Sequence, residues 1–270
     1  MRIFISLDAE GCTGLTSFEQ VTPGNARYQD GVYAMIEDLG SILAGAREAG
    51  ATEFVICDAH NDGMNLPLTP LGEDVRVVRG TGHPLSMMAG IDTAEFDGAI
   101  FMGYHAKNGA PGVMSHTYYF PSVERVFIGD LEVGEFGLNA CVAGSFDVPS
   151  IMISGDDVVA KEAREIAPLI DSCITKEALG NGCALCLDRA QTHLELHACA
   201  KLAVLEAKNA RPAIAPVPEI TIHFSQAEKA KAASVFGTLV SDRTVLYTGD
   251  TYLPAFRNAV KGMEAADRII

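Results

Sequence analysis

The sequence predicts an α/β fold with a mostly parallel sheet that is covered by helices. Continuous apolar segments rich in β-branched and aromatic residues, beginning with residues 2–7, are typical of strands buried on both faces. Segments with the amphipathic periodicity of helices lie between these strands, and such alternation is typical of βαβ units. In sheets of this kind the ligand site lies at the carboxyl ends of the strands.

The elements of the first half follow one another in a regular order. A strand at 2–7 precedes a helix over about 26–49, whose apolar side chains form one stripe and which ends at Gly50. The next elements are strands at 53–57 and 75–79, a short helix near 84–89, a strand at 98–102, a hairpin of 126–128 with 131–133, a helix at 135–143 and a strand at 150–154.

The second half has a weaker pattern. It predicts a helix at 157–169, a strand at 172–175, a long helix at 187–208, an extended connection at 210–218, a strand at 219–224, a helix at 226–233, a strand at 244–247 and a helix at 252–265. We therefore expect a catalytic α/β domain over residues 1–170 and a smaller α/β portion over residues 171–270.

Composition excludes several classes of protein. The chain has 270 residues, of which 48% are hydrophobic and 20% charged, as in globular proteins, and its net charge is −15. No Lys/Arg-rich segment is present, which argues against nucleic acid or an anionic membrane as a partner. Because neither a signal peptide nor an apolar segment of roughly 18–20 residues is found, we expect a cytoplasmic protein. Seven cysteines, mostly in apolar segments, suit reduced thiols.

Two carboxylates, Asp8 and Glu10, stand at the end of the first strand. Residues i and i+2 of an extended chain point to the same side, so these two charges lie close together and repel each other. A divalent metal between them, or a shared proton, would relieve the repulsion. Alternatively, Asp8 caps a turn and Glu10 is solvated.

Further polar residues follow the other expected strands. The second strand leads to His60, the strand at 98–102 leads to His105 with His116 in the loop behind it, and Glu135 opens the helix after the hairpin. Each histidine alone fits a hydrogen-bonded structural residue, but together with the two carboxylates they form a set of metal ligands. Such ligands suit zinc, or manganese or cobalt, and their number favours two metals bridged by a carboxylate.

The same residues lie in motifs that resemble the DppA family, the D-aminopeptidases of the dipeptide-transport operon. The motifs occur in the order of the family and cover about the first 160 residues, at positions 6–11, 58–60, 103–106, 111–116, 133–140 and 154–157.

The resemblance implies a role for each candidate residue. Asp8 would bridge two zinc ions, Glu10 and His60 would complete one of them, and His105 and Glu135 the other. His116 would stand beside the metals as a catalytic acid/base.

The resemblance also implies an activity and an assembly. The expected activity is removal of an N-terminal D-amino acid such as D-Ala from short peptides or amides. The expected assembly is a ring-like homo-oligomer, a decamer, whose active sites face inward.

Two other functions fit the ligand set less well. A dimetal hydrolase of another bond, such as a phosphoester, would be expected to carry Lys or Arg near the motifs. A peptide- or metal-binding module without turnover would not need His116. A second metal site at Cys183, Cys186, His193 and His197 is disfavoured, because neither the zinc-finger spacing nor the H-E-x-x-H order is present.

Overall fold

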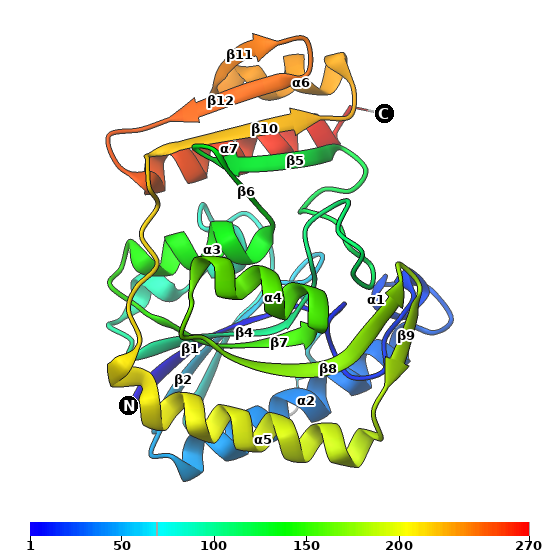
Figure 1. Ribbon diagram of the computed structural model, residues 1–270, viewed down its shortest axis with the longest axis vertical. Coiled ribbons are helices and arrows are strands. Elements are labelled where there is room, and N and C mark those ends of the chain that lie inside the picture. Colours follow the sequence, from blue (N-terminus) through cyan, green and yellow to red (C-terminus); the bar gives the residue numbers. More distant parts are fainter. Residues whose placement is uncertain (69, 270) are drawn as a thin grey trace.

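A seven-stranded sheet and a five-stranded sheet form the two halves of the molecule in the computed structural model, which describes residues 1–68 and 70–269 (Figure 1). The strands of the larger sheet are, in spatial order, β3 (Val75–Val78), β2 (Glu53–Asp58), β1 (Arg2–Leu7), β4 (Gly98–Tyr104), β7 (Ser150–Asp156), β8 (Asp171–Gly180) and β9 (Cys183–Cys186). Neighbouring strands run parallel except for the antiparallel pair of β8 and β9.

Helices cover both faces of this sheet, which confirms the predicted fold class. One face packs against α2 (Tyr28–Glu48) and α5 (Arg189–Glu206), and the other against α3 (Glu135–Gly144) and α4 (Asp157–Ile166) (Figure 1). Because side chains alternate along a strand, Ile3, Ile5 and Leu7 of β1 enter the core under α2 and α5, whereas Phe4 enters the opposite core. Burial on both faces explains the continuous apolar sequence of β1.

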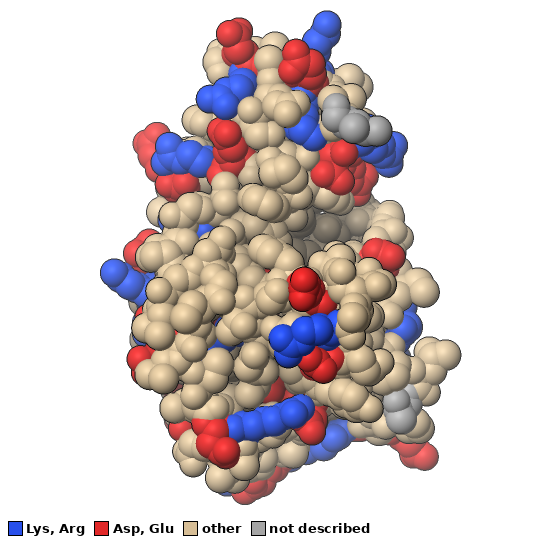
Figure 2. Space-filling model, turned by 90° about the vertical axis from the view of Figure 1, so that its right-hand side faces the viewer, with Lys and Arg blue, Asp and Glu red and all other residues tan. Residues whose placement is uncertain are grey.

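The smaller sheet is antiparallel throughout. Its strands are, in spatial order, β11 (Thr238–Ser241), β12 (Thr244–Thr248), β10 (Glu219–Phe224), β5 (Val123–Ile128) and β6 (Leu131–Val133). The helices α6 (Ala227–Ala233) and α7 (Tyr252–Asp267) pack against it. On the face in Figure 2, acidic and basic side chains are interspersed and a hollow lies between the two halves.

The two sheets do not follow the expected boundary at residue 170. Strands β8 and β9 lie beyond it yet extend the large sheet, whereas β5 and β6 lie before it yet join the small sheet. The chain thus leaves the large half to form the β5–β6 hairpin of the small sheet and then continues in the large half from α3 to α5. It enters the small sheet a second time through residues 210–218. The division into a catalytic domain and a smaller portion stays a prediction.

Nearly all the predicted helices and strands are present, with ends within a few residues of those expected. The sequence interpretation missed several short elements, namely α1 (Phe18–Val21), β9, β11 and the 3₁₀ helices η2 (Ile91–Thr93) and η4 (Ser234–Phe236). The predicted strand at 172–175 is the centre of the longer β8, and the short helix near 84–89 is the 3₁₀ helix η1 (Ser86–Met88). Over the described ranges, none of the helices has the length and apolar character needed to cross a membrane.

Candidate metal centre

Glycines bring the ends of neighbouring strands into close contact at one edge of the large sheet. The Gly11 amide donates to the Gly103 carbonyl at 2.7 Å. A Cβ on Gly11 would lie 2.1 Å from the backbone carbonyl oxygen of Tyr104. A Cβ on Gly103, whose φ is +71°, would lie 2.2 Å from the backbone carbonyl oxygen of Asp8. Only glycine permits this approach, which places the segment after β1 against the segment after β4.

The structure brings all six sequence-predicted site residues to this edge. Asp8 and Glu10 follow β1, His60 follows β2, His105 follows β4, and Glu135 is the first residue of α3. Each of these five residues is at most 6% exposed. Such deep burial of three carboxylates requires compensating charge close by.

Asp8 lies between two histidines, with one carboxylate oxygen facing each. His60 Nδ1 is 3.0 Å from Asp8 Oδ1 and 3.2 Å from Glu10 Oε2. His105 Nε2 is 3.5 Å from Asp8 Oδ2 and 3.4 Å from Glu135 Oε1. Two ligands of one tetrahedral zinc lie about 3.3–3.5 Å apart when each is about 2.0–2.1 Å from the metal. The spacing around His105 therefore fits a shared cation better than direct hydrogen bonds.

Backbone carbonyls orient the histidine rings. His60 Nε2 is 2.7 Å from the Val21 oxygen, and His105 Nδ1 is 3.1 Å from the Ala106 oxygen. A carbonyl can only accept, so these ring nitrogens carry the hydrogen. In the neutral form of each ring, the opposite nitrogen points a lone pair toward the carboxylates, which is the arrangement found in metal-bound histidines.

Without a cation, protons would have to hold the cluster together. Burial, and then the charge of Glu10, raise the pKa of Asp8 to about 7. Burial opposes the protonation of both histidines, but Glu10 and Asp8 hold the pKa of His60 well above its usual value, and Glu135 does the same for His105. Divalent cations could replace these protons.

Two buried oxygens point to cations rather than protons. Asp8 Oδ2 and Glu10 Oε2 have no hydrogen-bond partner within the described part of the chain. A buried carboxylate oxygen without a partner is costly, and a metal ion would remove that cost. The donor set of carboxylate oxygens and imidazole nitrogens thus fits zinc.

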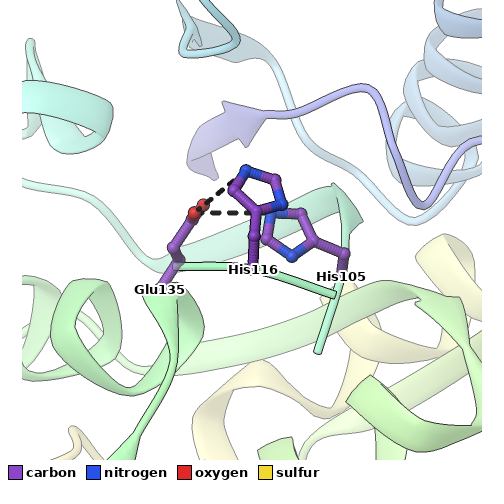
Figure 3. A group of neighbouring side chains, drawn as sticks. All are labelled: His105, His116 and Glu135. Carbon is purple, nitrogen blue, oxygen red and sulfur yellow. Dashed lines mark ion pairs between the residues drawn. The ribbon is translucent and has the colours of Figure 1, made fainter. Parts of the chain in front are cut away.

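His116 lies beside the cluster, at its more open side. Its ring stacks on His105, with centroids 3.9 Å apart and planes at 10°, and its Nε2 is 3.8 Å from Glu135 Oε1 (Figure 3). His116 Nδ1 is 2.9 Å from the Met114 oxygen, so Nε2 is the nitrogen left free. Burial, and then the neighbouring His105, lower the pKa of His116. The ring is therefore neutral near pH 7 and can accept a proton.

A cavity of about 170 Å³ opens onto this cluster. Its lining includes Ala59, Met87, Tyr118 and Tyr119 beside five of the candidate site residues, Asp8, Glu10, His60, His116 and Glu135. A larger hollow of about 390 Å³ around His223 and Arg243 lies elsewhere, and among the described residues it holds no group suited to a metal.

Sequence reasoning missed residues that hold the ligand segments in place. Lys176 is fully buried, and its Nζ donates to the Glu10 and Cys12 carbonyls, both at 2.7 Å. Glu162 accepts from the backbone amides of Lys107 and Gly134, both at 3.0 Å. Neither residue has a motif or spacing that would have singled it out.

The two histidines of the disfavoured second metal site have other partners in the structure. His193 Nε2 is 3.2 Å from Asp38 Oδ1, and His197 Nε2 is 3.2 Å from Glu48 Oε2. Both histidines thus pair with acidic residues of α2, while Cys183 and Cys186 lie exposed on β9.

Comparisons with known proteins show the family to which the chain belongs. A family model described as D-aminopeptidase matches residues 1–260. The chain is 34% identical to a D-aminopeptidase of Bacillus subtilis (strain 168), over 99% of this chain and 98% of that protein. It also superposes with a TM-score of 0.94 and 33% identity on the structure of the Zn-dependent D-aminopeptidase DppA from Bacillus subtilis, described as a self-compartmentalizing protease, covering 99% of this chain and 98% of that one. The chain therefore belongs to the D-aminopeptidase family of peptide hydrolases.

Proposed function

We propose that this peptide hydrolase is a dizinc aminopeptidase that removes an N-terminal D-amino acid, with D-Ala as the preferred residue, from short peptides or amides. The observation that carries the proposal is the position of Asp8, with one oxygen toward His60 and the other toward His105. The full-length similarity of the chain to a relative described as Zn-dependent supports zinc as the metal.

Each cation would have its own protein ligands and would share Asp8. Glu10 and His60 would complete one position, and His105 and Glu135 the other. When bound, zinc would polarise the scissile carbonyl and lower the pKa of an attacking water.

His116 is the residue placed to move protons. Its Nε2 lies 3.8 Å from Glu135 Oε1, and the residue lines the cavity. Because its pKa is lowered, Nε2 can take a proton from the attacking water near pH 7 and then deliver it to the leaving amine. The carbonyl of Met114 holds the other ring nitrogen and fixes the direction in which Nε2 points.

The cavity lining argues for a peptide rather than a phosphoester substrate. No lysine or arginine is among the described residues around it, and the face in Figure 2 has basic side chains only interspersed with acidic ones. Phosphate sites usually recruit such cations. The small volume suits a small N-terminal residue such as alanine.

The proposal extends to the assembly and location of the protein. A relative described as self-compartmentalizing supports a ring-like homo-oligomer, for which we propose a decamer with inward-facing sites. The cytoplasm remains the expected compartment.

Hydrolysis of D-Ala and L-Ala p-nitroanilides and of matched short peptides, with and without chelator, tests the activity. We expect cleavage that the chelator abolishes, with kcat/KM at least about tenfold higher for the D-epimers. Equal rates on the two epimers would leave the metallopeptidase intact and overturn the D-selectivity.

The variant His116→Ala tests the division between ligands and proton carrier. Its metal content should stay at the wild-type level while turnover falls about 10²–10⁴-fold. Loss of one metal ion from this variant would instead make His116 a ligand.

A further inference from the structure

A buried hydrogen-bond network lies directly behind one wall of the cavity. At its centre is Asn139 of α3, one helical turn after Glu135 and 0% exposed. Asn139 Nδ2 donates to the Tyr104 hydroxyl at 3.0 Å and lies 3.3 Å from Met87 Sδ. Asn139 Oδ1 accepts from the Tyr118 hydroxyl at 3.0 Å. One amide thus contacts two wall residues, Met87 and Tyr118.

The hydrogen-bond directions in this network have a single solution. The Ser6 hydroxyl donates to the Met87 carbonyl at 2.8 Å, so in its 2.7 Å contact with Tyr104 it must accept. The Tyr104 hydroxyl therefore gives its hydrogen to Ser6 and accepts from Asn139 Nδ2. This fixes the orientation of the Asn139 amide and leaves its oxygen for Tyr118. A hydrogen-bond network whose central members are buried and satisfied holds them rigidly, and it extends here to the half-buried Tyr118.

Tyr118 is held at both ends by residues of α3. Its backbone amide donates to Glu135 Oε1 at 2.6 Å, and its hydroxyl donates to Asn139. Its φ is +54°, in the left-handed region that is unfavourable for a tyrosine. A backbone conformation of this kind persists only where the surroundings impose it, so the position of the Tyr118 ring depends on these two bonds.

These wall residues lie where a substrate's first side chain must go. Met87 and Tyr118 line the same cavity as Asp8 and Glu135. If the scissile carbonyl is bound at the carboxylates, as the proposed function requires, the N-terminal residue lies within one residue's length of them. The cavity of about 170 Å³ is smaller than most small-molecule pockets, which span about 300–1,000 Å³.

We propose that Asn139 is a specificity-determining positioning residue, which limits the N-terminal residue of the substrate to a small side chain by fixing Met87 and Tyr118. This inference rests on the proposed aminopeptidase function. A soft apolar pocket discriminates between side chains by only about 1–3 kcal/mol per methylene. Rejection of a larger residue therefore needs walls that cannot move aside, and the network supplies that rigidity.

Two variants weaken the network by different amounts. Tyr118→Phe removes one hydroxyl and keeps the ring and the backbone bond to Glu135, whereas Asn139→Ser removes the amide that joins both walls. The matched control is Tyr252→Phe, because Tyr252 of α7 donates a buried hydroxyl to the Leu138 carbonyl of the same helix but does not line the cavity.

The readouts are kcat and KM for D-Ala and D-Leu p-nitroanilides, zinc content, and calorimetric binding of free D-Ala and D-Leu. We expect Tyr118→Phe and Asn139→Ser to reduce the preference for D-Ala over D-Leu about tenfold, mainly through a lower KM for D-Leu. Zinc content should not change, and Tyr252→Phe should keep the wild-type preference.

Three results would overturn the inference. They are a wild-type enzyme that binds the two amino acids equally, an unchanged preference in Tyr118→Phe, or the same loss of preference in Tyr252→Phe. A wild-type protein that binds D-Ala more tightly than D-Leu but cleaves neither substrate would refute the proposed function. The calorimetric affinities of the variants for the two amino acids would still decide the role of Asn139.

Discussion

Glu162→Gln should weaken one of the two proposed zinc positions without touching a ligand. The Glu162 carboxylate reaches from α4 to two backbone amides, those of Lys107 and Gly134, at 3.0 Å each. Lys107 is two residues after His105, and Gly134 directly precedes Glu135. One buried side chain therefore holds both segments that carry His105 and Glu135, the ligands proposed for one of the two zinc positions.

The size of the effect follows from the change of one acceptor into a donor. Glutamine has nearly the same shape, but its amide group would face one of the two backbone N–H groups. A charge-assisted bond is worth about 1.5–3 kcal/mol, and a buried donor without a partner costs about 1–3 kcal/mol. Since the two are not additive, we expect a loss of about 2–4 kcal/mol in the free energy of unfolding. Residues that support metal ligands typically contribute about 10–100-fold in metal affinity.

Urea denaturation and zinc competition with a chromophoric chelator measure the two consequences. The control is Glu165→Gln on the same helix, where the side chain is exposed. One zinc should be lost to the chelator about 10–100-fold more easily while the other is retained. Wild-type retention of both zinc ions in Glu162→Gln would refute the reasoning, and so would an equal effect in the control.

Two further predictions concern the metal itself. Asp8→Ala should remove more metal and activity than any other single substitution, because both cations lose an anionic ligand; two zinc ions per chain in this variant, measured by elemental analysis, would refute the bridging role. Zinc binding near pH 7 should release at least two protons, because the raised pKa values of His60 and His105 keep both rings protonated until a cation displaces their protons, and Asp8, with a pKa of about 7, is also partly protonated. Zinc affinity should accordingly fall as the pH is lowered. Calorimetry in buffers of different ionisation enthalpy measures the number of protons released, and a value of zero would contradict this prediction.

The parallel core could be predicted because its pattern is local. Strand β1 is buried on both faces, so its sequence alone gives its ends correctly. The missed strands lack such a pattern: β11 is exposed along its whole length, and β9 is the edge strand of its sheet, where it pairs with β8. Their strand character comes from pairing with a partner, which no residue within them reveals.

The candidate ligands could be predicted for a similar reason, whereas the residues that hold the ligand segments in place could not. Asp8, His60 and His105 each follow a recognisable strand, and the topology of a parallel sheet brings strand ends together. Lys176, by contrast, reaches a carbonyl 166 residues away in sequence, and Glu162 reaches amides 55 and 28 residues away. Both bind backbone atoms, which every residue has, so no residue type or spacing marks the partner.

The two unpartnered oxygens bear on how many cations the site would hold. Asp8 Oδ2 lies 3.5 Å from His105 Nε2, and Glu10 Oε2 lies 3.2 Å from His60 Nδ1. Each proposed position thus has its own imidazole nitrogen and its own carboxylate oxygen that lacks a hydrogen-bond partner. A single cation could satisfy one of these oxygens and would leave the other buried at a cost of about 1–3 kcal/mol or more. The arrangement therefore favours occupancy of both positions, with Asp8 as the ligand between them.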